Sequence, residues 1–89
     1  SDLGTWNSLY TLMEKDDDKN VVVGEKVMLN QSFANYVNIQ TDKVVILKDM
    51  DDYIVVDTKD ALLICKRENE QQIADLLNEA KLKYGEEIK

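Results

Sequence analysis

Short apolar runs separated by polar turns dominate the central part of the chain. Three of these runs cover residues 44–47, 53–56 and 61–65, and acidic turns at residues 49–52 and 57–60 separate them. β-Branched residues are frequent in the first two runs, and none of the three is long enough for a core helix. The pattern therefore predicts three short strands, around which the rest of the chain is organised.

Further strands are predicted upstream of this stretch. Residues 21–23 are consecutive valines, residues 26–30 alternate with Val27 and Leu29 on one side, and residues 33–39 alternate again. Short strands at such regular spacing are typical of a small sandwich, a barrel or a solenoid. Proline is absent and glycine is scarce, which makes a set of tight two-residue hairpins less favoured. Because no exact repeat is present, periodicity alone leaves these architectures open.

Asparagines recur in this β region at Asn20, Asn30, Asn35 and Asn38. In a β-solenoid, asparagines at corners can hydrogen-bond the backbone of adjacent coils. Asparagine is also an ordinary turn residue, because its side chain bonds to nearby backbone and tolerates the left-handed conformation. Both interpretations are open at this point.

Helical spacing is present on both sides of the β region. Trp6, Leu9, Tyr10 and Met13 fall on one face of a helix, which we predict over about residues 5–15. A helix of this length is marginal by itself in water, so its apolar face must pack on something.

A second helix is predicted at the C-terminal end of the chain. Asn69 is placed to cap it, Gln72 occupies the capping-box position, and Gly85 is placed to end it. We expect its apolar stripe to cover an open end or face of the β region, and a partner-helix interface is the alternative. The stripe consists of Ile73, Leu76, Leu77, Ala80 and Tyr84.

Composition limits the functions open to this chain. Eighty-nine residues suffice for one small domain with a thin core. The net charge of −7 argues against a nucleic-acid partner, because phosphate binding needs a basic surface. No apolar stretch approaches the roughly 18–20 residues needed to cross a bilayer, so we expect a cytoplasmic protein. Cys65, the only cysteine, lies in an apolar run and is interpreted as a small buried hydrophobe.

The chain lacks the side chains on which most catalytic devices depend. It contains no histidine, which rules out His-dependent nucleophilic catalysis, and its three glycines cannot form a phosphate-binding loop. Asp16, Asp18 and Asn20 imitate the start of a calcium loop, but Val21 stands where the loop requires glycine, so we interpret them as an exposed turn. We assign no catalytic and no nucleotide-binding residue within these 89 residues.

Several segments resemble, in the same order, segments of bacterial mannose-1-phosphate guanylyltransferases. Residues 1–9 resemble the pattern S-D-x-G-x-W-x-x-L near the end of that family's catalytic domain, and residues 14–24 resemble its E-K-D…G-N-V-x-x-G passage. Residues 51–64, D-D-Y-I-V-V-D-T-K-D-A-L-L-I, resemble its L-D-D-x-x-V-V-x-T-x-D-A-L-L-V block, with Met50 in place of the first leucine.

The resemblance implies a parent enzyme that makes GDP-mannose and pyrophosphate from GTP and mannose 1-phosphate, usually with magnesium. It implies that residues 1–18 end the nucleotidyltransferase domain and that residues 19–67 form a mainly β, left-handed β-helix-like domain. Residues 68–89 would then be a helix packed on this domain. Asp2 matches an aspartate at that family's metal site, whereas the glycine-rich nucleotide loop is missing. The resemblance thus implies that these 89 residues are inactive by themselves.

Different roles are compatible with these observations. The first is a structural and assembly domain that supports its own catalytic domain and can form a homodimer. The alternative is an independent acidic module for protein binding or oligomerisation, without any catalytic role. Binding of an allosteric sugar nucleotide is a further hypothesis.

Overall fold

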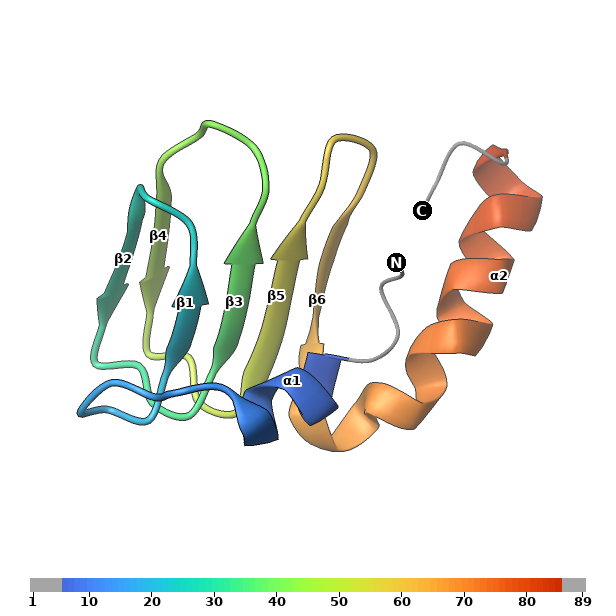
Figure 1. Ribbon diagram of the computed structural model, residues 1–89. Coiled ribbons are helices and arrows are strands. Elements are labelled where there is room, and N and C mark those ends of the chain that lie inside the picture. Colours follow the sequence, from blue (N-terminus) through green and yellow to red (C-terminus); the bar gives the residue numbers. More distant parts are fainter. Residues whose placement is uncertain (1–5, 86–89) are drawn as a thin grey trace.

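The structure, a computed structural model, describes residues 6–85 and has a mainly β body, with the N-terminal helix across the lower part of the strands and the C-terminal helix beside the last strand (Figure 1). Every predicted strand segment contains a strand, which confirms the mainly β prediction. The N-terminal helix ends earlier than predicted, before the acidic turn. The elements are α1 (Trp6–Leu12), β1 (Val21–Val23), β2 (Val27–Asn30), β3 (Tyr36–Ile39), β4 (Val45–Lys48), β5 (Tyr53–Asp57), β6 (Leu62–Lys66), the 3-10 helix η1 (Arg67–Gln72) and α2 (Ile73–Tyr84).

The strands form a larger and a smaller sheet. The larger sheet has the order β1-β3-β5-β6, and the smaller sheet consists of β2 and β4. All pairs are parallel except β5 with β6. Because β1, β2, β3, β4 and β5 alternate between the sheets, the chain passes back and forth between them before it reaches β6.

The later passes of the chain stack with an offset of 18 residues, whereas β1 pairs with β3 at an offset of 15. Tyr36 lies opposite Ile54 in the larger sheet, the smaller sheet has the same offset, and hydrogen bonds between passes also span 18 residues. Corners recur at this spacing, since Ala34 and Asp52 both have left-handed backbones, with φ of 61° and 64°. Parallel stacking of this kind is the arrangement of a short solenoid and differs from a hairpin sandwich.

The stacking ends after β5, where the chain turns back instead of beginning another pass. The Thr58 N–H donates to the Ala61 carbonyl at 2.8 Å, and the Thr58 hydroxyl oxygen accepts from the Ala61 N–H at 3.1 Å. This turn directs β6 antiparallel to β5. Strands β5 and β6 therefore form a hairpin at the end of the stack, although the sequence disfavoured a fold built from a set of tight two-residue hairpins.

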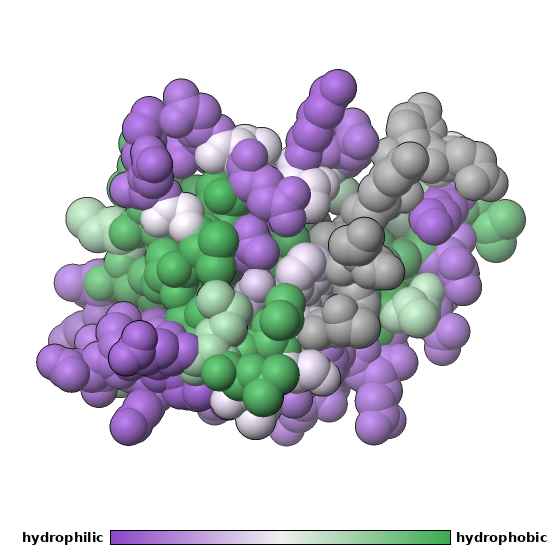
Figure 2. Space-filling model, in the orientation of Figure 1, coloured by the Kyte–Doolittle hydropathy of each residue, from purple (hydrophilic) through white to green (hydrophobic). Residues whose placement is uncertain are grey.

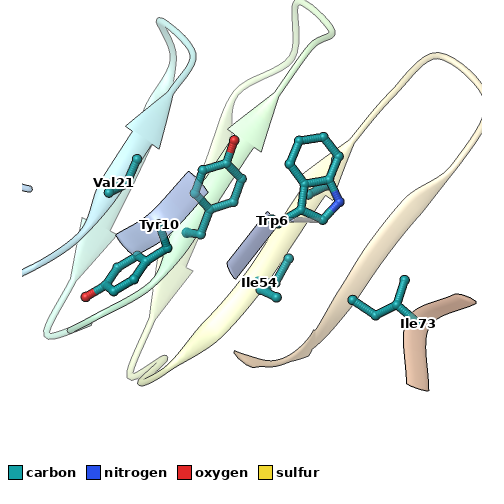
Figure 3. Packing of buried hydrophobic residues seen from close by; sticks show 7 residues of the cluster. Trp6, Tyr10, Val21, Ile54 and Ile73 are labelled. Carbon is teal, nitrogen blue, oxygen red and sulfur yellow. The ribbon is translucent and has the colours of Figure 1, made fainter. Parts of the chain in front are cut away.

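The larger sheet is apolar on both faces, as is usual for parallel strands covered on both sides. Toward the smaller sheet, Val37, Ile39 and Val55 are buried among partly buried side chains of β2 and β4. We call the cluster on the opposite face, under the helices, the outer core. Its buried members are Trp6, Tyr10, Val21, Tyr36, Ile54, Val56 and Ile73 (Figure 3).

Asn20 and Asn35 form a buried polar ladder at one corner of the stack. The Asn20 Oδ1 accepts both the backbone N–H and the Nδ2 group of Asn35, and the Asn20 Nδ2 donates to the Ser32 carbonyl. The Asn35 Nδ2 donates to the Met50 carbonyl at 2.7 Å, and its Oδ1 accepts the Tyr53 N–H at 2.7 Å. For these two asparagines the corner interpretation is confirmed.

The C-terminal helix begins later than predicted, and its cap differs. The prediction that Asn69 caps it was wrong, because Asn69 lies within η1 and α2 starts at Ile73 without a side-chain cap. The Arg67 N–H donates to the Asp52 carbonyl at 2.7 Å, which ties the start of η1 to the turn before β5. Gly85 ends α2 with φ 111°, as predicted. Within residues 6–85, no helix is both long and apolar enough to span a membrane.

Candidate functional site at the α1 junction

The predicted metal ligand, Asp2, lies outside the described residues, so its role stays a prediction. Within residues 6–85, no group of three or more His, Cys, Asp or Glu side chains could hold a metal ion. Asp16 instead accepts the backbone N–H groups of Asp18 and Asn20 at 2.9 Å each, which agrees with an ordinary turn. A polar cluster that joins distant segments of the described part lies elsewhere, where α1 meets the strands.

Aromatic side chains hold α1 against the outer face of the larger sheet. The Trp6 ring stacks on the Tyr36 ring with a centroid distance of 5.6 Å and an angle of 20° between the planes. Tyr10 is buried as well, and its hydroxyl donates to the Lys19 carbonyl at 2.8 Å. Figure 3 shows Trp6 and Tyr10 over the strands that carry Val21 and Ile54. The helical face predicted to pack therefore does so at both aromatic positions.

Arg67 connects α1 to two corners of the β stack. Its Nε donates to the Ala34 carbonyl at 3.0 Å, its Nη1 to the Asn7 Oδ1 at 3.1 Å, and its Nη2 to the Asp52 Oδ1 at 3.1 Å. The guanidinium also lies 4.0 Å from the centroid of the Tyr10 ring. A planar guanidinium can make these contacts simultaneously because its N–H groups point in fixed, different directions.

Glu70 completes the attachment of α1 from the η1 side. Its carboxylate accepts the backbone N–H of Asn7 at 2.7 Å. This N–H belongs to the first turn of α1, where backbone donors have no partner within the helix and a negative charge is favoured by the helix dipole. Arg67 and Glu70 thus bind both the side chain and the backbone of Asn7. We call the set of Trp6, Asn7, Arg67 and Glu70 the α1 clamp.

An open cavity of about 280 Å³ lies beside the clamp, lined by Asn7, Asp52, Lys66, Arg67 and Glu68. Its lining carries two positive and two negative side chains. Arg67 is already occupied by its protein partners, and the Lys66 Nζ donates to the Asp51 carbonyl at 3.1 Å. The cavity therefore offers no unengaged pair of cations for a phosphate group.

Cys65 is less buried than the sequence interpretation predicts. It lies partly buried at the margin of the outer core and forms no disulfide. Burial raises the pKa of its thiol, and the negative charge of Glu70 raises that pKa further. Because the thiolate is the reactive form, this environment is unsuited to nucleophilic catalysis.

Sequence reasoning did not single out the polar members of the clamp. Asn7 lies 60 residues from Arg67 and 63 from Glu70, so no local pattern joins them. The sequence did contain one indication of the role of Arg67, which is the only arginine in the chain. An isolated arginine directly after a strand was a reasonable candidate for a directed, multivalent contact.

We expect Arg67→Lys to lower the free energy of unfolding by about 1–2 kcal/mol, because lysine keeps the charge but loses the fork that reaches three acceptors. Urea unfolding followed by circular dichroism measures this change. Lys59→Ala in the exposed turn before β6 is the control and should stay within about 0.5 kcal/mol of the parent chain. A lysine variant as stable as the parent would show that the fork is dispensable.

The fold and the clamp define a class of protein: a small parallel β domain that fastens a preceding helix to its sheet. The chain is 34% identical over 77 residues to the alginate biosynthesis protein AlgA of Pseudomonas putida, covering 86% of this chain and 16% of that protein. It is 27% identical over 89 residues to a mannose-1-phosphate guanylyltransferase of Escherichia coli, covering 100% of this chain and 19% of that protein. The predicted resemblance to mannose-1-phosphate guanylyltransferases is confirmed.

The structural comparison agrees at the level of the fold. A crystal structure described as mannose-1-phosphate geranyltransferase from Thermus thermophilus matches with a TM-score of 0.70 and 19% sequence identity, over 85% of this chain and 23% of that one. No protein-family model matches the chain. The chain spans only 16–19% of the two relatives described above, so it corresponds to a limited part of much longer proteins.

Proposed function

We propose that this chain is the C-terminal β domain of a mannose-1-phosphate guanylyltransferase and supports the catalytic domain of that enzyme. The parent protein converts GTP and mannose 1-phosphate to GDP-mannose and pyrophosphate in the cytoplasm. In this proposal residues 1–18 belong to the end of the nucleotidyltransferase domain, residues 19–67 to a left-handed β-helix-like domain, and residues 68–89 to its packed helix. The support for this assignment is the similarity to guanylyltransferases along most of the chain.

The α1 clamp is the observation that carries the structural role. In the proposed division, α1 lies in the segment that ends the catalytic domain. Stacking of Trp6 on Tyr36 and the hydrogen bonds of Asn7 to Arg67 and Glu70 join this helix to the β stack. Several directed contacts restrict both the position and the rotation of the helix. The β domain would therefore hold the end of the catalytic domain in one orientation.

Metal chemistry is assigned in this proposal to residues upstream of the β stack. Asp2 is the candidate ligand by resemblance, and magnesium commonly takes one or two protein carboxylates, with phosphates and water completing its shell. Bound magnesium would neutralise phosphate charge during guanylyl transfer. In this proposal the β domain supports the catalytic domain, and the chemistry takes place upstream of it.

A homodimer completes the proposal. In the described sheets β1 and β2 are edge strands, each paired on one side only. Unpaired strand edges favour association with another chain. Strand β1 consists of three valines, of which Val22 and Val23 are partly exposed, so no charged side chain within this strand opposes pairing.

The proposed function is tested by measuring GDP-mannose formation from GTP and mannose 1-phosphate with Mg²⁺. We expect turnover by the full-length protein, none by the 89-residue chain, and a loss of about 100-fold or more in full-length Asp2→Asn, if Asp2 binds the metal. Asp17→Asn, in the exposed acidic turn, is the matched control and should retain activity. A full-length protein without turnover, or an active 89-residue chain, would contradict the proposal.

A further inference from the structure

The apolar stripe of α2 is only partly covered by the β domain. Ile73 is fully buried and Leu77 packs against the outer core, but Leu76 is 47% and Tyr84 68% exposed. In Figure 1, α2 adjoins the body at its first residues and stands apart from β6 toward its end, and Figure 2 shows the hydropathy of the same face of the molecule. The predicted packing of the stripe on the β region is therefore confirmed at Ile73 and Leu77, but it does not extend to Leu76 and Tyr84.

The contacts of α2 with the β domain contribute little to the stability of this helix beyond its first turns. Twelve residues are too few for a stable isolated helix in water, and packing of the apolar face normally supplies the missing stability. Leu76 and Tyr84 lie on or beside the stripe that starts at Ile73, whereas Leu82 lies on the opposite side of the helix and is 90% exposed. Leu76 and Tyr84 therefore extend the apolar face of the helix, whereas Leu82 is an isolated exposed leucine on its polar side.

The small size of this surface disfavours a second copy as its partner. Leu76 and Tyr84 together offer at most a few hundred Å², well below the roughly 800 Å² per partner that stable complexes bury. A domain joined to this chain covalently needs far less contact area, because the link raises its effective concentration.

The remainder of the parent enzyme meets these requirements. The chain spans 16% and 19% of the two relatives described above, so most of such a protein lies outside this chain. The outer core contains both Trp6, at the start of α1, and Ile73, at the start of α2. The start of α1 and the start of α2 therefore pack on the same face of the larger sheet.

We propose that the α2 surface formed by Leu76, Leu77, Ala80 and Tyr84 packs against the nucleotidyltransferase domain of the same chain. This inference rests on the proposed function, since it takes the preceding part of the protein to be that domain. The β domain would then hold its catalytic domain at two places, the α1 clamp and the α2 surface. Such a second contact fixes the relative orientation of two domains, which a single helix attachment leaves free to pivot.

Photo-cross-linking in the full-length protein tests this contact. A photoreactive phenylalanine analogue replaces Tyr84 in one variant and Leu82, on the opposite side of α2, in the control. We expect position 84 to cross-link within the same chain to the preceding domain, and position 82 to give at least about tenfold less product. Cross-links between two copies from position 84, or no cross-link above the level of position 82, would overturn the proposal.

Hydrogen exchange gives an independent readout that does not depend on the cross-linker. In full-length Leu76→Ser, we expect deuterium uptake in residues 73–84 to become about tenfold faster, while Leu82→Ser leaves it unchanged. Equal uptake in the two variants would contradict docking of α2. Because neither readout uses GDP-mannose formation, a protein that cross-links but lacks turnover would refute the proposed activity and leave the contact intact.

Discussion

Replacing Trp6 with alanine is expected to lower the free energy of unfolding by about 3–5 kcal/mol, the range for removing a large buried aromatic side chain. The Trp6 side chain is 6% exposed and stacks on Tyr36 within the outer core. A small domain has a total stability of only about 5–15 kcal/mol. The loss should therefore detach α1 or leave much of the domain unfolded. Urea unfolding followed by far-UV circular dichroism measures it, because Trp6 is the only tryptophan available for fluorescence.

Two further variants separate stacking from general effects on the helix. Leu12→Ala lies on the same helix at a side chain that is 81% exposed, and it should change stability by less than about 0.5 kcal/mol. Trp6→Phe should retain much of the stability, because the Trp6 Nε1 donates no hydrogen bond within the described structure. Equal losses in Trp6→Ala and Leu12→Ala would contradict the packing of α1 on the sheet.

Asn35→Ala is expected to destabilise the protein by about 3 kcal/mol through unpaired buried polar groups, since each buried group left without a partner costs about 1–3 kcal/mol. Asn35 is fully buried, and its side chain bonds to Asn20, to the Met50 carbonyl and to the Tyr53 N–H. Alanine can satisfy none of these groups, so the corner would open to water or distort. Urea unfolding, with Tyr53 amide exchange as a local probe, measures the effect.

The matched control is Asn38→Ala in strand β3. Asn38 is half-buried, and its Nδ2 makes a single side-chain hydrogen bond, to the Tyr36 hydroxyl at 3.0 Å. Losing one such bond should lower the free energy of unfolding by about 0.5–1.5 kcal/mol. A loss at Asn35 no larger than that at Asn38 would show that the polar ladder does not hold successive passes of the chain together.

Local patterns in the sequence were sufficient to place the strands. The valine run at 21–23 and the apolar runs after residue 43 became strands because β-branched side chains suit an extended backbone with neighbours on both sides. The face of α1 was also predictable, since helical spacing brought Trp6 and Tyr10 to one side. In the same way, the acidic segment at residues 16–20 was correctly interpreted as a turn, because Asp16 accepts the backbone N–H groups of Asp18 and Asn20.

The candidate site could not be found in this way. The partners of Arg67 lie 15, 33 and 60 residues away, so their proximity exists only after the passes have stacked. The start of α2 illustrates the same limit. Asn69 satisfied the local rule for a helix cap, yet the hydrogen bond from Arg67 to the Asp52 carbonyl places this segment in η1. A tertiary contact thus outweighed a local preference.

The sequence by itself determined the mainly β class, the approximate positions of the strands and helices, the absence of a His-dependent catalytic device, and the resemblance to guanylyltransferases. These features depend on composition, local periodicity and short motifs. Only the tertiary structure decided the parallel 18-residue stacking, the ladder of Asn20 and Asn35, the α1 clamp and the uncovered surface of α2. The physical reason is that hydrogen-bond register and burial depend on contacts between segments distant in the chain. Several short apolar strands of similar sequence do not by themselves specify which of them pair, or in which register.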